Sequence, residues 1–150
     1  QRQMCIRDRQ RQMCIRDRVV KVPATRDGFA AASALVRDGA TVLVTAVYSV
    51  AQALVCASIG AQYIAPYLGR MRDAGIDGDA VIARMQGMCA GSDSNVLAAS
   101  LRSPDDITGL RLAGVPYFTA APDVIEQMLF HGVSDSSAAE FDAAMVRLGA

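Results

Sequence analysis

Short apolar runs alternate with longer amphipathic stretches from residue 19 onward. Five runs rich in Val, Ile, Leu, Ala and Tyr predict β-strands: Val19–Pro23, Thr41–Val47, Tyr63–Tyr67, Val96–Ser100 and Val115–Thr119. Between and after them the pattern predicts helices at 26–38, 49–59, 78–88, 104–113 and 122–130, and a last helix near 137–148. The longer gap at 70–93 predicts an extended loop plus a helix. Such alternation indicates parallel strands joined by helical crossovers.

Five strand–helix units fit either a doubly wound sheet or five-eighths of a closed (β/α) barrel, and the pattern leaves both open. A complete barrel usually needs about 250 residues, whereas this chain has 150. No Gly-x-Gly-x-x-Gly follows a predicted strand, so a dinucleotide-binding version has no support.

The first eighteen residues are two perfect copies of Gln-Arg-Gln-Met-Cys-Ile-Arg-Asp-Arg, at 1–9 and 10–18. Structural repeats are longer, at about 20 to 50 residues. Codons for Met-Cys-Ile-Arg-Asp-Arg can spell a string that resembles the transposase end used as a sequencing adapter. We therefore interpret 1–18 as an adapter-derived artefact, not native, and 19–150 as the protein proper. The alternative is a basic nucleic-acid arm, which would need no perfect duplication.

Without that segment the 15 basic and 15 acidic residues become 9 and 13, a net charge of −4. A mildly acidic surface argues against nucleic acid as a partner. No apolar run is long enough to span a bilayer, and residues 1–18 contain no signal peptide, so we expect no membrane partner. Cys56 and Cys89 have small or apolar neighbours and no metal-type spacing. They predict buried thiols in a reducing compartment, hence a cytoplasmic protein with no metal.

Lys21 is the only lysine of the chain and lies within Val-Val-Lys-Val-Pro, a run that predicts a strand buried on both faces. Burial would lower the pKa of its ammonium and favour the neutral amine, the form that attacks a carbonyl to give a Schiff base. The alternative is a lysine at a strand end that reaches solvent or a carboxylate.

Polar residues stand near the carboxyl ends of three other predicted strands. Thr45 and Ser100 lie within or at the end of apolar runs, and Tyr67 and Arg70 follow Tyr-Ile-Ala-Pro. In a barrel such strand ends meet at one mouth. A tyrosine there can relay a proton, and an arginine and a serine can hold a phosphate. Taken singly, each of these residues is more often a strand or core residue.

Four segments stand out together: Val-Val-Lys-Val-Pro-Ala-Thr (19–25), Thr-Ala-Val-Tyr-Ser-Val-Ala-Gln-Ala (45–53), Gly-Ala-Gln-Tyr-Ile-Ala-Pro-Tyr-Leu-Gly-Arg (60–70) and Val-Leu-Ala-Ala-Ser-Leu-Arg-Ser (96–103). In this order they resemble the transaldolase family, above all its small members, the fructose-6-phosphate aldolases and short bacterial transaldolases. The resemblance implies an α/β fold: a partial TIM (β/α)8 barrel of about five βα units, strands 4 to 8, plus the C-terminal helix. Strands 1 to 3 and their polar residues would be absent.

The resemblance also implies a role for each matching residue. Lys21 matches the Schiff-base lysine, and Thr45 the threonine that helps hold the catalytic water. Tyr67 matches the position at which fructose-6-phosphate aldolases carry a proton-transferring tyrosine and classical transaldolases a phenylalanine. Arg70 and Ser100 match residues that bind the substrate phosphate, and Ala65 lines the same pocket.

The implied activity is that of a class I aldolase acting on fructose 6-phosphate or related ketose phosphates, with no cofactor. One alternative is a transaldolase of the pentose phosphate pathway that transfers a dihydroxyacetone unit between sugar phosphates. Another is a fragment that is catalytically incomplete as it stands. The expected partner is a small sugar phosphate, and the full-length parent is expected to be a homo-oligomer.

Overall fold

Five parallel strands form one sheet in the order in which they follow along the chain. The computed structural model describes residues 18–149. Of the segment 1–18 that we interpret as an artefact, all residues except Arg18 lie outside the described part. The strands are β1 (Val19–Pro23), β2 (Thr41–Val47), β3 (Tyr63–Pro66), β4 (Asn95–Leu101) and β5 (Tyr117–Ala120). The helices are α2 (Arg26–Arg37), α3 (Val50–Ser58), α4 (Leu68–Asp73), α5 (Gly78–Met88), α6 (Pro104–Leu112), α7 (Pro122–Leu129) and α8 (Gly132–Leu148).

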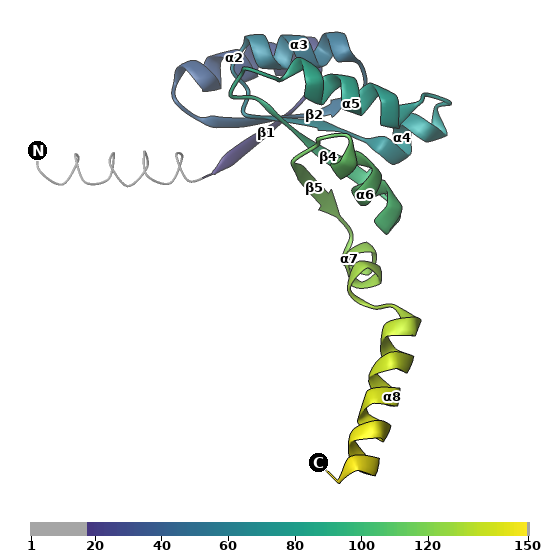
Figure 1. Cartoon of the computed structure of the whole chain (residues 1–150). Helices are drawn as coiled ribbons and strands as arrows, with labels where there is room; N and C mark the ends of the chain where they lie inside the picture. Colours follow the sequence, from purple (N-terminus) through teal and green to yellow (C-terminus); the bar gives the residue numbers. More distant parts are fainter. Residues whose placement is uncertain (1–17, 150) are drawn as a thin grey trace, which may run out of the picture.

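The sequential strand order decides between the two folds that the pattern left open. In a doubly wound sheet the strand order reverses at a switch point, whereas in a (β/α) barrel each strand pairs with the next along the chain. Here β1 to β5 pair in sequence and all in parallel, and α2, α3 and α5 lie over one side of the sheet (Figure 1). The structure is a five-stranded α/β fold consistent with a partial TIM barrel, as expected.

Most of the helices begin at side chains that satisfy free backbone N–H groups. Thr25, Ser49, Asp77 and Ser103 each accept a hydrogen bond from an N–H in the first turn of α2, α3, α5 and α6. Ser103 also forms a reciprocal capping box with Asp106. Such caps each contribute about 1 kcal/mol and fix the residue at which a helix begins. Because three of these caps follow shortly after a strand, they also fix the loops at the carboxyl end of the sheet.

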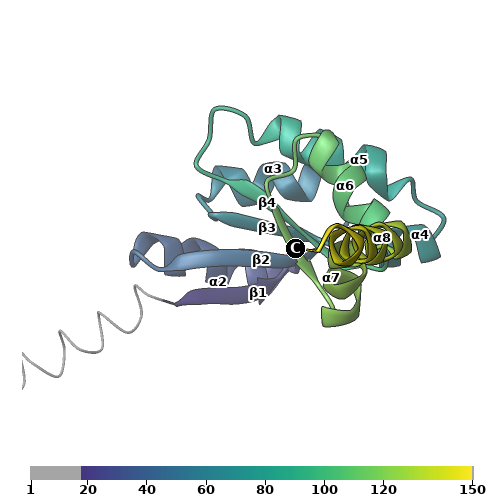
Figure 2. The ribbon, with the colours of Figure 1, turned by 60° about the horizontal axis from the view of Figure 1, so that its bottom comes forward.

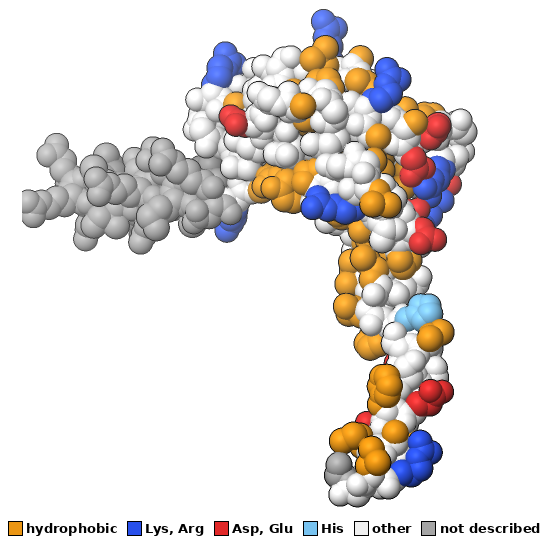
Figure 3. All heavy atoms as spheres, viewed as in Figure 1, with side chains coloured by type: hydrophobic (Ala, Val, Ile, Leu, Met, Phe, Trp, Pro, Cys, Tyr) orange, Lys and Arg blue, Asp and Glu red, His pale blue; other side chains and the backbone are white. Residues whose placement is uncertain are grey.

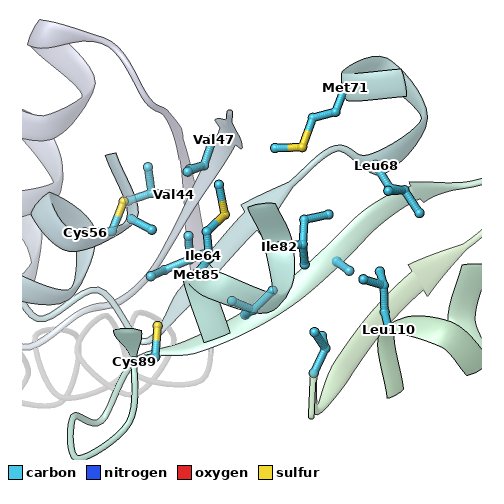
Figure 4. Packing of buried hydrophobic residues seen from close by; sticks show 14 of the residues in the cluster. Val44, Val47, Cys56, Ile64, Leu68, Met71, Ile82, Met85, Cys89 and Leu110 are labelled. Atoms are coloured by element: carbon cyan, nitrogen blue, oxygen red, sulfur yellow. The ribbon is translucent and has the colours of Figure 1, made fainter. Parts of the chain in front are cut away.

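The hydrophobic core lies between the sheet and the helices. Alternate strand residues, including Val44 and Ile64, point to the helices and are fully buried, and they pack with Leu68, Met71 and Met85 (Figure 4). The remaining strand residues face the other side of the sheet, which no helix covers in the described part of the chain (Figure 2). One face of the sheet is therefore packed and the other is concave and open.

Both predicted thiols are buried in this core. Cys56 on α3 and Cys89 at the end of α5 are free cysteines. Burial raises the pKa of the Cys56 thiol to about 12, and it also raises the pKa of Cys89. Both side chains are therefore protonated thiols that act as small hydrophobic residues.

Apart from shifts of one or two residues at element ends, three predictions differ from the structure. Strand β1 is an edge strand whose residues alternate between exposed and half-buried, so the expectation of burial on both faces was wrong for this chain. A helix that was not predicted, α4, begins at Leu68 and runs into the gap at 70–93, because Tyr67 ends the extended run and Leu68 and Met71 bury one helical face. The last helix begins at Gly132, with the His131 side chain accepting a hydrogen bond from an N–H of its first turn.

Helices α7 and α8 extend from the sheet as an arm (Figure 1). Helix α8 has no buried residue, and apolar side chains such as Phe141 and Val146 are exposed along it (Figure 3). No helix within residues 18–149 combines the length and the apolar character needed to cross a membrane.

Gly28 is packed so closely that it allows a stability test of the α2–β1 contact. A Cβ atom at Gly28 would lie 1.9 Å from the carbonyl oxygen of Pro23. We expect Gly28→Ala to lower the free energy of unfolding by about 1–3 kcal/mol, because the backbone of β1 must move. Gly109→Ala in α6 meets nothing within 4 Å and should raise stability by about 0.5–1 kcal/mol. Urea unfolding followed by circular dichroism measures both, and unchanged stability of Gly28→Ala would contradict the observed packing.

Candidate active site

A pocket of about 440 Å³ opens on the concave face, towards the carboxyl ends of the strands. All six residues predicted from the sequence line it, together with four others: Lys21, Leu43, Thr45, Ala65, Tyr67, Arg70, Leu97, Ala99, Ser100 and Thr119. The members that come from the strands lie in the register that parallel pairing imposes, with Lys21 opposite Leu43 and Thr45 opposite Ala65. The structure thus brings together residues up to ninety-eight positions apart in the sequence.

A bulge near the end of β2, directly after Thr45, turns the next buried residue, Val47, back to the core. The register between β2 and β3 shifts between Thr45 and Val47, and Ala46 has a positive φ of 57°. Before the bulge, Val44 points to the core and Thr45 to the pocket; after it, Val47 points to the core again. A non-glycine residue in this region costs about 1–2 kcal/mol, so packing on both sides must hold it there.

A second bulge occurs at the end of β4. The register with β5 shifts between Ala98 and Leu101, both of which face the core. Ser100 has a φ of 59°, and both Ala99 and Ser100 line the pocket. A regular strand would send one of two successive side chains to the core. The bulge therefore places the Ser100 hydroxyl on the side of the pocket.

Thr45 and Tyr67 form a close hydroxyl pair inside the pocket. The Thr45 Oγ1 and Tyr67 Oη atoms are 2.7 Å apart, and Thr45 is only 8% exposed. The hydrogen bond from Thr45 lowers the pKa of Tyr67, burial opposes the shift, and the positive charges of Lys21 and Arg70 lower it further. A phenol that is more acidic than usual and hydrogen-bonded to a second hydroxyl is suited to move a proton.

Lys21 lines the pocket but is exposed to solvent. The desolvation of this amine that the sequence predicts is not observed in the described part of the chain. The cause is the position of β1, which pairs with β2 on one side and, among residues 18–149, has no strand on the other. The amine is nevertheless close enough to Tyr67 for its charge to lower the pKa of that phenol.

Arg70 and Ser100 form the polar, positively charged part of the pocket. The guanidinium carbon of Arg70 lies 5.0 Å from the ring centroid of Tyr67, a distance at which a cation is attracted to the ring face. Arg70 is exposed, so its charged end is free to meet a ligand from solvent. Together the two residues offer a fork of N–H donors and a hydroxyl, which suit a phosphate.

Acid–base pairs outside the pocket hold the loops that carry these residues. The carboxylate of Asp106 accepts from Arg72 at 2.6 Å and from the backbone N–H of Arg102 at 2.6 Å. Burial alone would raise the pKa of Asp106, but these hydrogen bonds hold it below its usual range. The side chain of Arg102 donates to both carboxylate oxygens of Asp73 on α4. These bonds fasten α4, which carries Arg70, to the end of β4, which carries Ser100.

Four residues of the pocket were not predicted from the sequence: Leu43, Leu97, Ala99 and Thr119. Leu43 shares a face of β2 with Thr45, so strict alternation could have found it, and Leu97 and Ala99 lie on the strand that carries Ser100. Thr119 carries no such signal, since β5 is short and displaced by two residues from its predicted start. Within residues 18–149 no group of three or more His, Cys, Asp or Glu residues could hold a metal ion.

Comparisons with known proteins address the family of the chain. The family model described as transaldolase/fructose-6-phosphate aldolase matches residues 8–149. Curated relatives from Paracoccus denitrificans, Cereibacter sphaeroides and Hyphomonas neptunium, each described as a probable transaldolase, are 38%, 38% and 37% identical over 132 residues. The alignments cover 87% of this chain and 60–61% of the relatives, so the chain spans about three-fifths of their length.

Solved structures give a more distant likeness. Mandelate oxidase with (S)-2-phenylpropionate and with benzoyl-formic acid matches 61% of this chain and 28% of its own chain, with a TM-score of 0.51 and 19% identity. At this identity the likeness concerns the fold alone. The family match, by contrast, spans nearly the whole chain and includes every residue of the pocket. The chain belongs to the transaldolase/fructose-6-phosphate aldolase family.

Proposed function

We propose that this chain carries the Schiff-base half of the active site of a class I aldolase that acts on fructose 6-phosphate or a related ketose phosphate. The single observation that supports this most strongly is the composition of the concave pocket. It holds the only lysine of the chain, a pair of hydrogen-bonded hydroxyls and a guanidinium with a serine. These are an electrophile-capturing amine, a proton relay and a phosphate site, in one cavity of substrate size.

In the proposed reaction, the neutral amine of Lys21 attacks the ketose carbonyl and water leaves, which gives an iminium ion. Removal of the proton from the C4 hydroxyl breaks the C3–C4 bond, and the bonding electron pair moves into the iminium to give an enamine. The aldose phosphate departs. Protonation of the enamine at C3 and hydrolysis then release dihydroxyacetone and restore the amine. Thr45 and Tyr67 move the protons, directly or through water.

Arg70 and Ser100 are proposed to bind the phosphate of the substrate. Arg70 is exposed and Ser100 is placed on the pocket side by its bulge. A charge-assisted bond from the guanidinium and a neutral bond from the hydroxyl would hold the phosphate end. Ala65, which is small and 3% exposed, leaves room for the carbon chain between this end and Lys21.

The Tyr67 phenol favours the aldolase over the transaldolase, which is the second candidate. A residue that can protonate the enamine at C3 leads to release of dihydroxyacetone, whereas without one the enamine survives to meet an aldose phosphate. The test is product analysis with fructose 6-phosphate, with and without a second aldose phosphate as acceptor. Free dihydroxyacetone that forms at the same rate in both mixtures supports the aldolase. Product that requires the acceptor would show the transaldolase instead.

A third candidate is a chain that is incomplete as a catalyst by itself. It is favoured by the exposure of Lys21 and by the exposed apolar residues Val19 and Tyr117, at 49% and 45%, which a closed barrel would cover. We therefore propose that the active form is the completed enzyme: residues 19–150 preceded by the missing strands, from the upstream reading frame or from the Paracoccus denitrificans relative. Activity of the 150-residue chain equal to that of the completed enzyme would exclude this candidate.

The wider setting of the enzyme follows from the same proposal. We propose a sugar phosphate as the small-molecule partner, a place in carbohydrate metabolism and a homo-oligomer of the completed enzyme. The buried free thiols Cys56 and Cys89 support a reducing compartment such as the cytoplasm. Size-exclusion chromatography with light scattering on the completed enzyme tests the oligomer.

A further inference from the structure

The amide side chain of Gln52 links the segment after β1 to the segment after β2. Gln52 lies in the first turn of α3 and is half-buried. Its Oε1 accepts a hydrogen bond from the N–H of Tyr48 at 2.8 Å, and its Nε2 donates to the carbonyl oxygen of Ala24 at 3.5 Å. Because an N–H only donates and a carbonyl only accepts, the two partners fix which atom of the amide faces which segment.

These contacts lie next to the residues that carry the proposed chemistry. Ala24 follows Lys21 by three residues, and Tyr48 follows Thr45 by three. The N–H of Ala24 also donates to the carbonyl oxygen of Thr45 at 2.8 Å. The ring of Tyr48 in turn packs edge-on against Tyr67, with centroids 6.2 Å apart. Gln52 therefore contacts the backbone just after the strand that carries Lys21 and the backbone just after the strand that carries Thr45.

Because β1 is an edge strand in the described part of the chain, the Gln52 link matters for the position of Lys21 relative to β2. In the described part of the chain β1 has β2 as its only strand neighbour, and their ladder ends at the pair Pro23 and Thr45. Beyond the ladder, the backbone bond from Ala24 and the amide of Gln52 continue the connection. A displacement of about 1 Å between reacting groups can cost as much as about 10²-fold in rate.

We propose that Gln52 is a positioning residue that fixes Lys21 relative to the Thr45–Tyr67 pair. The inference rests on the proposed Schiff-base function and deepens it, since Gln52 does not line the pocket and acts through the two strand ends. Both halves of the amide are needed, because Tyr48 requires an acceptor and Ala24 a donor.

Two variants in the completed enzyme separate these requirements. Gln52→Met keeps the length of the side chain and removes both hydrogen bonds. Gln52→Glu keeps the acceptor for Tyr48 but places a carboxylate against the Ala24 carbonyl, unless the carboxyl is protonated. Gln127→Met, at an exposed position of α7, is the matched control. The readouts are the rate at which borohydride traps the dihydroxyacetone imine on Lys21, and kcat and KM for fructose 6-phosphate.

We expect Gln52→Met to trap the imine about tenfold more slowly or worse, with a matching fall in kcat. KM should change less than about twofold if it reflects binding, because Arg70 and Ser100 are untouched. For Gln52→Glu, we compare its imine-trapping rate with that of the parent at each pH. This ratio should rise as the pH falls towards the carboxyl pKa of about 4.3, because the protonated carboxyl regains a donor for the Ala24 carbonyl. A residue with a merely structural role would give a flat ratio.

The outcomes distinguish this inference from the function on which it rests. If the parent traps no imine on Lys21, the proposed function fails and this inference fails with it. If the parent traps the imine and both Gln52 variants match the Gln127→Met control, only the positioning role is refuted. It is also refuted if Gln52→Met loses kcat and phosphate affinity equally, or if the rate ratio for Gln52→Glu does not depend on pH.

Discussion

Lys21→Arg is expected to abolish aldol cleavage by the completed enzyme. A guanidinium keeps the positive charge and nearly the length of the side chain, but it stays protonated and cannot form the imine. The expected loss is complete within the sensitivity of the assay, at least about 10⁴-fold, because every later step passes through the imine. A coupled assay that follows the aldose phosphate released from fructose 6-phosphate measures it.

The unique lysine of the chain offers a matched control. The double variant Lys21→Arg with Arg37→Lys restores one lysine at an exposed position of α2. It has the same overall composition as the parent, yet it should be as inactive as the single variant. Arg37→Lys alone should retain full activity. Measurable turnover in Lys21→Arg, or its recovery in the double variant, would contradict the role given to Lys21.

Tyr67→Phe is expected to reduce aldol cleavage by about 10²-fold, the usual contribution of a positioned acid or base. The variant keeps the ring against Tyr48 and Arg70 and removes only the hydroxyl that pairs with Thr45. Transfer of the three-carbon unit to an aldose phosphate should suffer less, because it does not need protonation of the enamine. Tyr63→Phe is the control, since Tyr63 packs edge-on against Tyr117 and lies outside the pocket lining.

The same residue predicts the alkaline limb of the pH profile. The folded structure lowers the pKa of Tyr67 from its ordinary value of about 10, so the neutral phenol is lost at a lower pH than in a free tyrosine. Activity that depends on this phenol as an acid should therefore fall with rising pH below about 10, and Tyr67→Phe should lack this limb. Equal, small losses of cleavage and transfer in Tyr67→Phe would mean that the tyrosine serves packing alone.

The sequence predicted those parts of the fold that local patterns determine. Strands β1 and β2 have the predicted bounds, because continuous apolar runs flanked by helix caps leave little freedom. The choice between two α/β folds could not be made from the pattern, because strand order depends on pairing between distant segments. It came from the resemblance, and the sequential sheet agrees with it. Helix α4 was missed because its six residues are too few to show a helical period.

The site was predicted in composition but not in all its physical properties. Lys21, Thr45, Tyr67, Arg70 and Ser100 lie around one pocket, as parallel strands with polar residues near their carboxyl ends imply. The bulges at Ala46 and Ser100 have no signal in the sequence, since neither position carries a glycine. The desolvation of Lys21 was expected from an apolar run, whereas actual burial depends on a neighbouring strand that the described chain does not supply.

The interpretation of residues 1–18 as an artefact stays a prediction, as do the roles of the individual pocket residues. The family match begins at residue 8, within the duplicated segment. Residues 1–17 lie outside the described part of the chain. Deletion of 1–18 should leave thermal stability unchanged, which melting curves of the full and the shortened chain check.

The central claim is that Lys21 forms the imine, and borohydride trapping tests it most directly. The completed enzyme is incubated with dihydroxyacetone and borohydride, digested and analysed by mass spectrometry. Residues 19–150 contain one lysine, and fragmentation of the digested peptides distinguishes it from any amine in the added strands. We predict one reduced three-carbon adduct, located on Lys21, at a rate well above that of the same lysine in the unfolded protein. An adduct that forms no faster in the folded enzyme than in the unfolded one, or that is absent from Lys21, would contradict the account.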